Sequence, residues 1–144
     1  MAILHHLGDL TEEEYVIKRA AEKLHRETNG EATIHTDHVD PRGTEDGDTL
    51  NVVDGIDGKP DLILKDFDYQ SLLVEAETIE GIKNDQHHAI KQLNDFRQAG
   101  YKRVLLVPKR QTSEAEDWLK ANTSKVENVD DVTVESAHSI PNLV

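Results

Sequence analysis

The chain has 144 residues, of which 29 are acidic and 16 basic, so its formal net charge is -13. This length suits one domain with a sizeable core but not two domains of ordinary size. The excess of negative charge disfavours binding of the whole surface to nucleic acid or to anionic membranes, so any such binding requires a local basic patch. The absence of cysteine excludes disulfides, thiolate metal sites and cysteine nucleophiles.

Hydropathy and composition also bear on where the protein acts. Because the apolar runs are only a few residues long, we expect neither a bilayer-spanning segment nor a signal peptide, and we predict a cytoplasmic protein without a membrane partner. The acidity and the aromatic content of 4% resemble those of proteins from salt-loving organisms, although ten lysines against six arginines are unusual for extreme halophiles. A solubilising acidic surface is the alternative interpretation.

The first part of the chain predicts a helix, a strand and a long loop. Thr11 and Glu14 have the spacing of a capping box, and apolar residues up to Leu24 share one helical face before Asn29-Gly30 ends the pattern. Residues 32–39 predict a strand. Residues 40–59 are rich in glycine and aspartate, which predicts a flexible acidic loop with a short strand over residues 50–53.

The rest of the chain has clearer secondary-structure patterns. In chain order we predict a strand over 60–64, a turn over 66–69, a strand over 71–77, a helix over 84–99 stopped by Gly100, an apolar strand over 103–107, a helix from Thr112 or Ser113 to residue 121, and a strand over 132–137. The order is an α-β-β-β-α-β core with a C-terminal helix and strand. It predicts a single α/β domain over residues 1–144, with one mixed sheet flanked by helices.

Three carboxylates lie against the apolar runs of the predicted hairpin. Asp61 begins the first strand, and Glu75 and Glu77 end the second on the same face. A turn centred near residue 68 places residue 61 opposite residue 75. Carboxylates gathered in this way repel one another unless a hard cation holds them, and oxygen ligands favour Mg²⁺ or Mn²⁺. Alternatively, Glu75 and Glu77 line a solvated face while the residues between and before them point inward.

These residues resemble the PD-(D/E)xK nuclease superfamily, which includes restriction endonucleases and archaeal Holliday-junction resolvases. The likeness rests on Pro60-Asp61, on Glu75-Ala76-Glu77 fourteen residues later, and on the order of elements over residues 10–108. The resemblance implies that Asp61, Glu75 and the Ala76 carbonyl bind Mg²⁺ or Mn²⁺. It further implies a DNA substrate and a homodimer.

The sequence departs from the family where a lysine is usual, because Glu77 occupies that position. Some restriction endonucleases of the superfamily carry a glutamate there. Glu77 is then expected to orient the attacking water or to bind a second metal, and Lys83 is a candidate for a relocated lysine. Loss of activity, leaving a binding module on the same fold, is the alternative.

Two further polar residues fall on core-facing sides of predicted helices. Glu13 lies at the centre of the first helix's apolar stripe and matches the accessory first-helix glutamate of resolvase-like members. Its alternative role is interaction with the positive end of the helix dipole. Gln86 lies one turn before the stripe of the second helix, where it is expected to reach the metal site or a phosphate, or to hydrogen-bond a strand end.

Charge is unevenly distributed. Residues 83–110 contain seven basic and two acidic residues, a net +5, so the rest of the chain carries -18. We predict DNA contacts within this segment from Gln86, Lys91, Arg97, Lys102 and Arg103. The adjacent His87 and His88 lie away from the apolar stripe and are expected at the solvated surface, with contact to a phosphate as the alternative.

The expected function is therefore a metal-dependent endonuclease that hydrolyses DNA phosphodiesters, with Asp61, Glu75, Glu77, Lys83 and Glu13 in the catalytic site. Because no base-reading motif is visible, DNA structure rather than sequence is the expected determinant of recognition. The alternatives are a catalytically inactive nucleic-acid or protein-interaction module, and an acidic structural protein.

Overall fold

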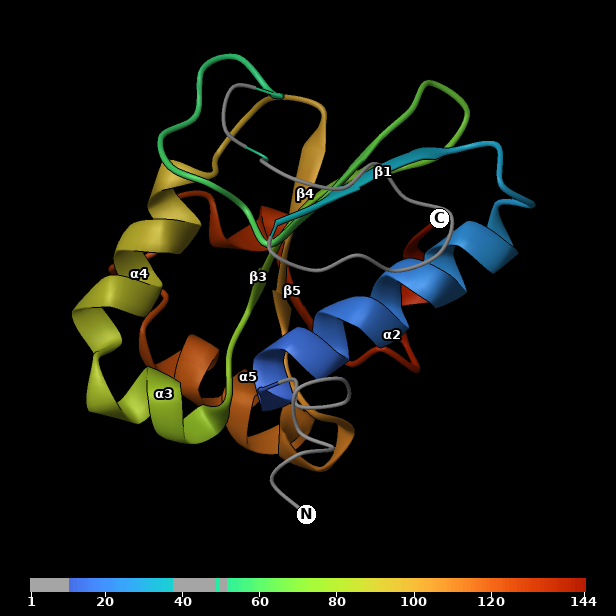
Figure 1. Cartoon of the computed structure of the whole chain (residues 1–144). Coiled ribbons are helices and arrows are strands. Elements are labelled where there is room, and N and C mark those ends of the chain that lie inside the picture. Colours follow the sequence, from blue (N-terminus) through green and yellow to red (C-terminus); the bar gives the residue numbers. More distant parts are fainter. Residues whose placement is uncertain (1–10, 38–48, 50–51) are drawn as a thin grey trace.

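Five strands form one open, mixed sheet with helices on both faces (Figure 1). The computed structural model describes residues 11–37, 49 and 52–144. Strands β1 (Thr33–Thr36), β2 (Leu62–Lys65) and β3 (Ser71–Ala76) are antiparallel neighbours. Strands β4 (Tyr101–Leu106) and β5 (Val132–Glu135) continue the sheet parallel to β3. The described helices are α2 (Glu12–Glu27), α3 (Ile79–Asn84), α4 (Gln86–Asp95) and α5 (Thr112–Ala121). The predicted fold class is confirmed.

Local sequence determines both ends of α2. The Thr11 side chain accepts a hydrogen bond from the Glu14 N–H at 3.1 Å, and the Glu14 carboxylate accepts one from the Thr11 N–H at 3.0 Å, so the capping box is present. Asn29 and Gly30 follow the helix with positive φ angles of 54° and 74°, which stop it. The helix is thereby held with its first turn at one end of the sheet.

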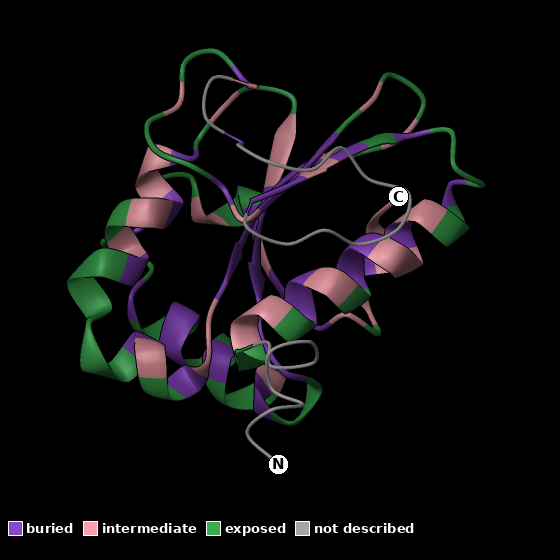
Figure 2. Cartoon of the chain, in the orientation of Figure 1, coloured by how far each residue is buried: buried purple, intermediate pink, exposed green. Residues whose placement is uncertain are grey.

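The sheet has a separate apolar core on each face. Side chains of α2 pack with Leu72 and Val74 of β3, whereas α3, α4 and α5 cover the other face. Leu73 points to that second face, where it packs with Phe96, and alternation puts Glu75 there as well. Figure 2 shows that the strands are the most buried elements of the molecule. A carboxylate on β3 is therefore enclosed from either side.

Several predicted boundaries were wrong. The helix predicted over residues 84–99 is shorter, α4 over Gln86–Asp95, and it begins at Asp85, whose side chain accepts a hydrogen bond from the His88 N–H at 3.1 Å. A separate helix, α3, precedes it where none was predicted. Gly100, with a φ of 84°, belongs to the turn before β4 rather than to a helix end. Residues 52–53 form a bend instead of the predicted strand. Residues 38–48, 50 and 51, which include most of the predicted loop, lie outside the described residues.

No helix among the described residues is both long enough and apolar enough to cross a membrane.

The structure gives Arg103 a different role from the DNA contact expected from the sequence. The side chain, 1% exposed, runs under α4, where Nη1 donates to the Leu93 carbonyl at 2.5 Å. Nη2 donates to the carbonyls of Asn128, at 2.7 Å, and of Glu127. Arg103 thus joins the end of α4 to the turn before β5. A guanidinium enclosed in this way is not available to a phosphate.

We predict that Arg103→Ala lowers the free energy of unfolding by about 3 kcal/mol, because it leaves buried carbonyls without a donor. Chemical denaturation measures the change. Lys120→Ala, at an exposed position of α5, is the matched control and should change stability by less than about 0.5 kcal/mol. Equal, small effects of the two substitutions would contradict the structural role of Arg103.

Candidate metal centre

Asp61 and Glu75 lie opposite each other where β2 and β3 meet. Leu62 pairs with Val74 in the sheet, and one step further along the same register places Asp61 across from Glu75. The Asp61 N–H donates to the Val74 carbonyl at 2.9 Å, and the Asp61 carboxylate accepts the Ala76 N–H at 2.8 Å. The opposition predicted from the hairpin turn is confirmed.

Glu75 is 6% exposed, so it does not belong to a solvated face. The alternative interpretation of a polar outward face is wrong for this residue because helices cover both faces of the sheet. Glu77 lies beyond the end of β3, where it is half-buried, and its N–H donates to the Leu106 carbonyl at 2.9 Å. The chain therefore continues along β4 after the strand ends and keeps Glu77 at the same edge.

Burial and mutual repulsion make these groups hold protons. Burial, followed by the charge of Asp61, raises the pKa of Glu75 to about 10. Burial also raises the pKa of Asp61, although its hydrogen bond from Ala76 favours the charged form. The pKa of Glu77 is raised to about 8 by burial and by a hydrogen bond with Glu13. Near neutral pH the metal-free cluster is thus partly protonated, and a cation would displace those protons.

The first turn of α2 and the segment after β1 bring two further acids to the cluster. Glu13 hydrogen-bonds with Glu77, so the helical phase predicted from the sequence does direct it toward the site. Asp37 is buried beside β2, where its N–H donates to the Asp61 carbonyl at 3.1 Å, and its charge contributes to the raised pKa of Asp61. Sequence reasoning passed over Asp37. The strand register would have found it, because Asp37 continues β1 opposite Asp61.

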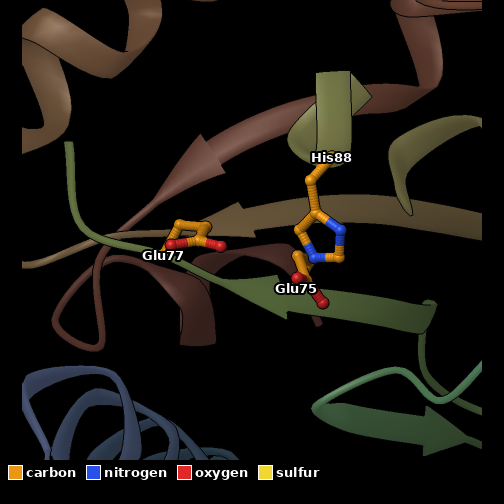
Figure 3. Close-up of side chains that lie close together, drawn as sticks. All are labelled: Glu75, Glu77 and His88. Carbon is orange, nitrogen blue, oxygen red and sulfur yellow. The ribbon is translucent and has the colours of Figure 1, made fainter. Parts of the chain in front are cut away.

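His88 is exposed, as expected from the sequence, but its ring also reaches the edge of the cluster. One ligand atom each from Glu75, Glu77 and His88 lie within 4.8 Å of one another. Figure 3 shows the His88 ring extending from α4 toward Glu75. Asp85 begins α4 as its N-cap, so His88 lies in the first turn of that helix, near Glu75 and Glu77 at the end of β3.

Gly81 leaves room for the Glu77 carboxylate. A Cβ atom at Gly81 would overlap Glu77 Oε1. Glu77 therefore lies directly against the first turn of α3, where the Gly81 N–H donates to Thr78 Oγ1 at 3.0 Å.

The other predicted site residues have local partners. Lys83 forms an ion pair with Glu114 of α5. Gln86 accepts a hydrogen bond from the Trp118 indole at 3.1 Å. Lys91 pairs with Asp95 at 2.5 Å. These contacts lie along the helices that cover the sheet, not within the group of Asp61, Glu75 and Glu77.

Arg97 and Lys102 lie near the opposite end of β4. Lys102 is the sheet partner of Leu72, whereas Leu105 is the partner of Glu75, so the two levels are about 10 Å apart along the strands. Arg97 pairs with Glu127 at 2.9 Å and lines, together with Lys102, a polar cavity of about 670 Å³. The structure does not bring these two cations to the carboxylates.

Comparison of the chain with protein-family models, with curated proteins and with solved structures gives no significant match. The chemistry of the site therefore rests on its geometry. Oxygen ligands in a mostly buried cluster, joined by one imidazole, form a donor set that suits Mg²⁺ or, with the nitrogen, Mn²⁺.

We predict that the metal-free protein loses stability as the pH rises from about 6 to about 9. Glu75 and Glu77 keep protons in the folded state up to pKa values of about 10 and 8, whereas their ordinary value is 4.5. Over this range the folded state binds more protons than the unfolded chain, so the free energy of unfolding falls as protons are removed. Thermal unfolding in EDTA should show a melting temperature several degrees lower at the higher pH.

The controls for this experiment are Glu75→Gln and Mn²⁺. The amide cannot ionise, so the variant should lose less stability over the same range, and Mn²⁺ should restore the wild-type melting temperature near pH 8. A wild-type protein that becomes more stable with rising pH in EDTA would contradict the raised pKa values.

Proposed function

We propose that Asp61, Glu75, Glu77 and His88 bind a divalent cation, Mg²⁺ or Mn²⁺. The observation that carries this proposal is the opposition of buried Glu75 and half-buried Asp61, with Glu77 beside Glu75. Isolated charges of one sign are rarely enclosed in a protein without a compensating ion. The hydrogen bond from Ala76 to Asp61 orients one carboxylate in advance, as expected of a ligand that must not rotate.

We further propose that the protein is a metal-dependent endonuclease of the PD-(D/E)xK type that cleaves DNA. Support comes from the order of elements, from the Asp61–Glu75 register, and from Glu13 at the site end of α2. When bound, the cation would polarise a phosphate and lower the pKa of a coordinated water. The homodimer that the resemblance implies stays a prediction.

The residues of this chain would divide the work. Asp61 and Glu75 hold the cation, and the Ala76 carbonyl is proposed to complete its ligands. Glu77 is half-buried, and its pKa is raised in the metal-free cluster; once a cation displaces its proton, the carboxylate would orient the attacking water or accept its proton. Lys83 pairs with Glu114, so the proposed chemistry assigns to Glu77 the place that a lysine has elsewhere in the family.

A catalytically inactive module that binds nucleic acid or protein is the second candidate. It is favoured by Glu77 in the lysine position and by the engagement of Lys83 with α5. Such a module would bind cation or nucleic acid without turnover.

We predict that the protein cleaves plasmid or branched DNA in the presence of Mg²⁺ or Mn²⁺. Asp61→Asn and Glu75→Gln should each lower the rate at least ~100-fold, because each removes a negative cation ligand while retaining similar shape. Asp68→Asn is the matched control, since it makes the same change in the exposed turn at the far end of the hairpin. Cleavage measured at low and at molar salt tests the reaction under both conditions.

Two results would contradict the proposed nuclease activity at this site. Binding of Mn²⁺ without cleavage of any DNA form would favour the inactive module. Cleavage that survives both ligand substitutions would place the reaction elsewhere or identify a contaminant.

We predict that His88→Asn weakens Mn²⁺ binding about tenfold and Mg²⁺ binding much less, because imidazole nitrogen is a better ligand for Mn²⁺ than for Mg²⁺. Isothermal calorimetry with each cation measures the two affinities. His87→Asn is the control at the neighbouring exposed position and should leave both affinities unchanged. Equal effects of the two substitutions on Mn²⁺ would exclude His88 from the coordination shell.

A further inference from the structure

A basic groove lies between α2 and the segments that follow β4 and β5. Its cationic lining consists of Arg19 and Lys23 from α2 and Lys109 and Arg110 from the segment after β4. Glu12 is the acidic residue among the lining residues, so the groove carries a net positive charge in a chain whose net charge is -13. The cavity has a volume of about 320 Å³.

The helix presents its part of this lining as a regular stripe. Tyr15, Arg19 and Lys23 are four residues apart and therefore lie on one face of α2. Tyr15 is 51% exposed, although it is a large aromatic residue, and Arg19 Nη1 lies 3.5 Å from its hydroxyl oxygen. The stripe combines two cations with an accessible aromatic ring.

Arg110, on the opposite wall of the groove, can exchange its ion-pair partner Glu12 for an anion. Arg110 forms an ion pair with Glu12 at 2.8 Å, but its side chain is 70% exposed. Ion pairs between exposed side chains contribute little to stability, so a phosphate can compete for the guanidinium. Lys109, beside Arg110 on this wall, is exposed.

The groove adjoins the carboxylate cluster through two direct connections. Glu12, at its rim, precedes Glu13, which hydrogen-bonds with Glu77. Gln111, which ends the short 3₁₀ helix Lys109–Gln111, accepts the Ile79 N–H at 2.7 Å, two residues after Glu77. The groove and the proposed metal centre therefore share the first turn of α2 and the segment after β4.

We infer that this groove binds the phosphates of one nucleic-acid strand as it leaves the metal centre. The inference rests on the proposed function for the class of ligand. Arg19, Lys23, Lys109 and Arg110 neutralise backbone phosphates, and Tyr15 offers a surface on which a base stacks. The cavity of about 320 Å³ has room for part of a single strand and not for the cross-section of a duplex. DNA binding is thereby assigned to this surface instead of to Arg97 and Lys102.

Fluorescence anisotropy with a labelled oligothymidylate of about 12 nucleotides tests the inference in EDTA, where no cleavage interferes. Arg19→Ala/Lys109→Ala should weaken binding about tenfold and lower the slope of log affinity against log salt by about 1.4, because two phosphate contacts are lost. Tyr15→Ser should weaken binding about fivefold and Tyr15→Phe should not, since the ring remains.

The matched control is Lys120→Ala/Lys125→Ala, which removes two exposed positive charges from α5 and the turn after it. This control should bind the oligonucleotide as the wild type does, and circular dichroism should show every variant folded. Unchanged binding by the groove variant would overturn the inference, as would an equal loss in the control. A loss confined to Arg97→Ala/Lys102→Ala would overturn it in favour of the other cavity.

Failure of the groove and failure of the nuclease are distinguishable. If oligonucleotide binding depends on the groove but the protein cleaves no DNA with either cation, the inference about the groove is retained and the nuclease proposal is rejected. If metal-dependent cleavage is unaffected by Arg19→Ala/Lys109→Ala, the nuclease proposal is retained and the inference about the groove is rejected.

Discussion

Carboxyl groups that are buried against one another need protons or a cation, and this requirement governs the end of the sheet where β3 stops. Asp61 and Glu75 face each other across two strands, and Glu77, Glu13 and Asp37 add further negative charge. The pKa values raised to about 10 and 8 express the free-energy cost of ionising Glu75 and Glu77 there. A divalent cation would relieve the same repulsion and retain the charges as ligands.

The architecture supplies this enclosure from four directions. The antiparallel hairpin sets Asp61 against Glu75, and parallel pairing with β4 keeps Glu77 at the sheet edge after β3 ends. The first turn of α4 places His88 near the end of β3, and the first turn of α2 closes the other side with Glu13. Basic residues line the groove next to this edge, between α2 and the segment after β4. The net charge of -13 is therefore the sum of an acidic cluster and a neighbouring basic groove with the rest of the surface.

Much of the site was predictable because it depends on local regularities. The symmetric hairpin predicts the opposition of Asp61 and Glu75, and helical phase predicts the direction of Glu13. His88 is exposed as predicted, but its proximity to Glu75 and Glu77 depends on how α4 packs on the sheet, which the periodicity of one helix does not reveal. The contacts that the side chains of Arg103 and Lys83 make were not predictable from the spacing of residues in the sequence. Long cationic side chains extend toward whichever carbonyl or carboxylate the tertiary fold brings near, here Leu93 and Glu114.

The central claim is that the buried carboxylates form a divalent-cation site, and crystals grown with Mn²⁺ test it most directly. An anomalous difference map should show a peak in contact with Glu75 and adjoining Asp61, Glu77 and His88. Crystals of Glu75→Gln grown in the same solution should lack it. A wild-type map with no peak in this cluster, while the carboxyl groups remain hydrogen-bonded to one another, would contradict the claim.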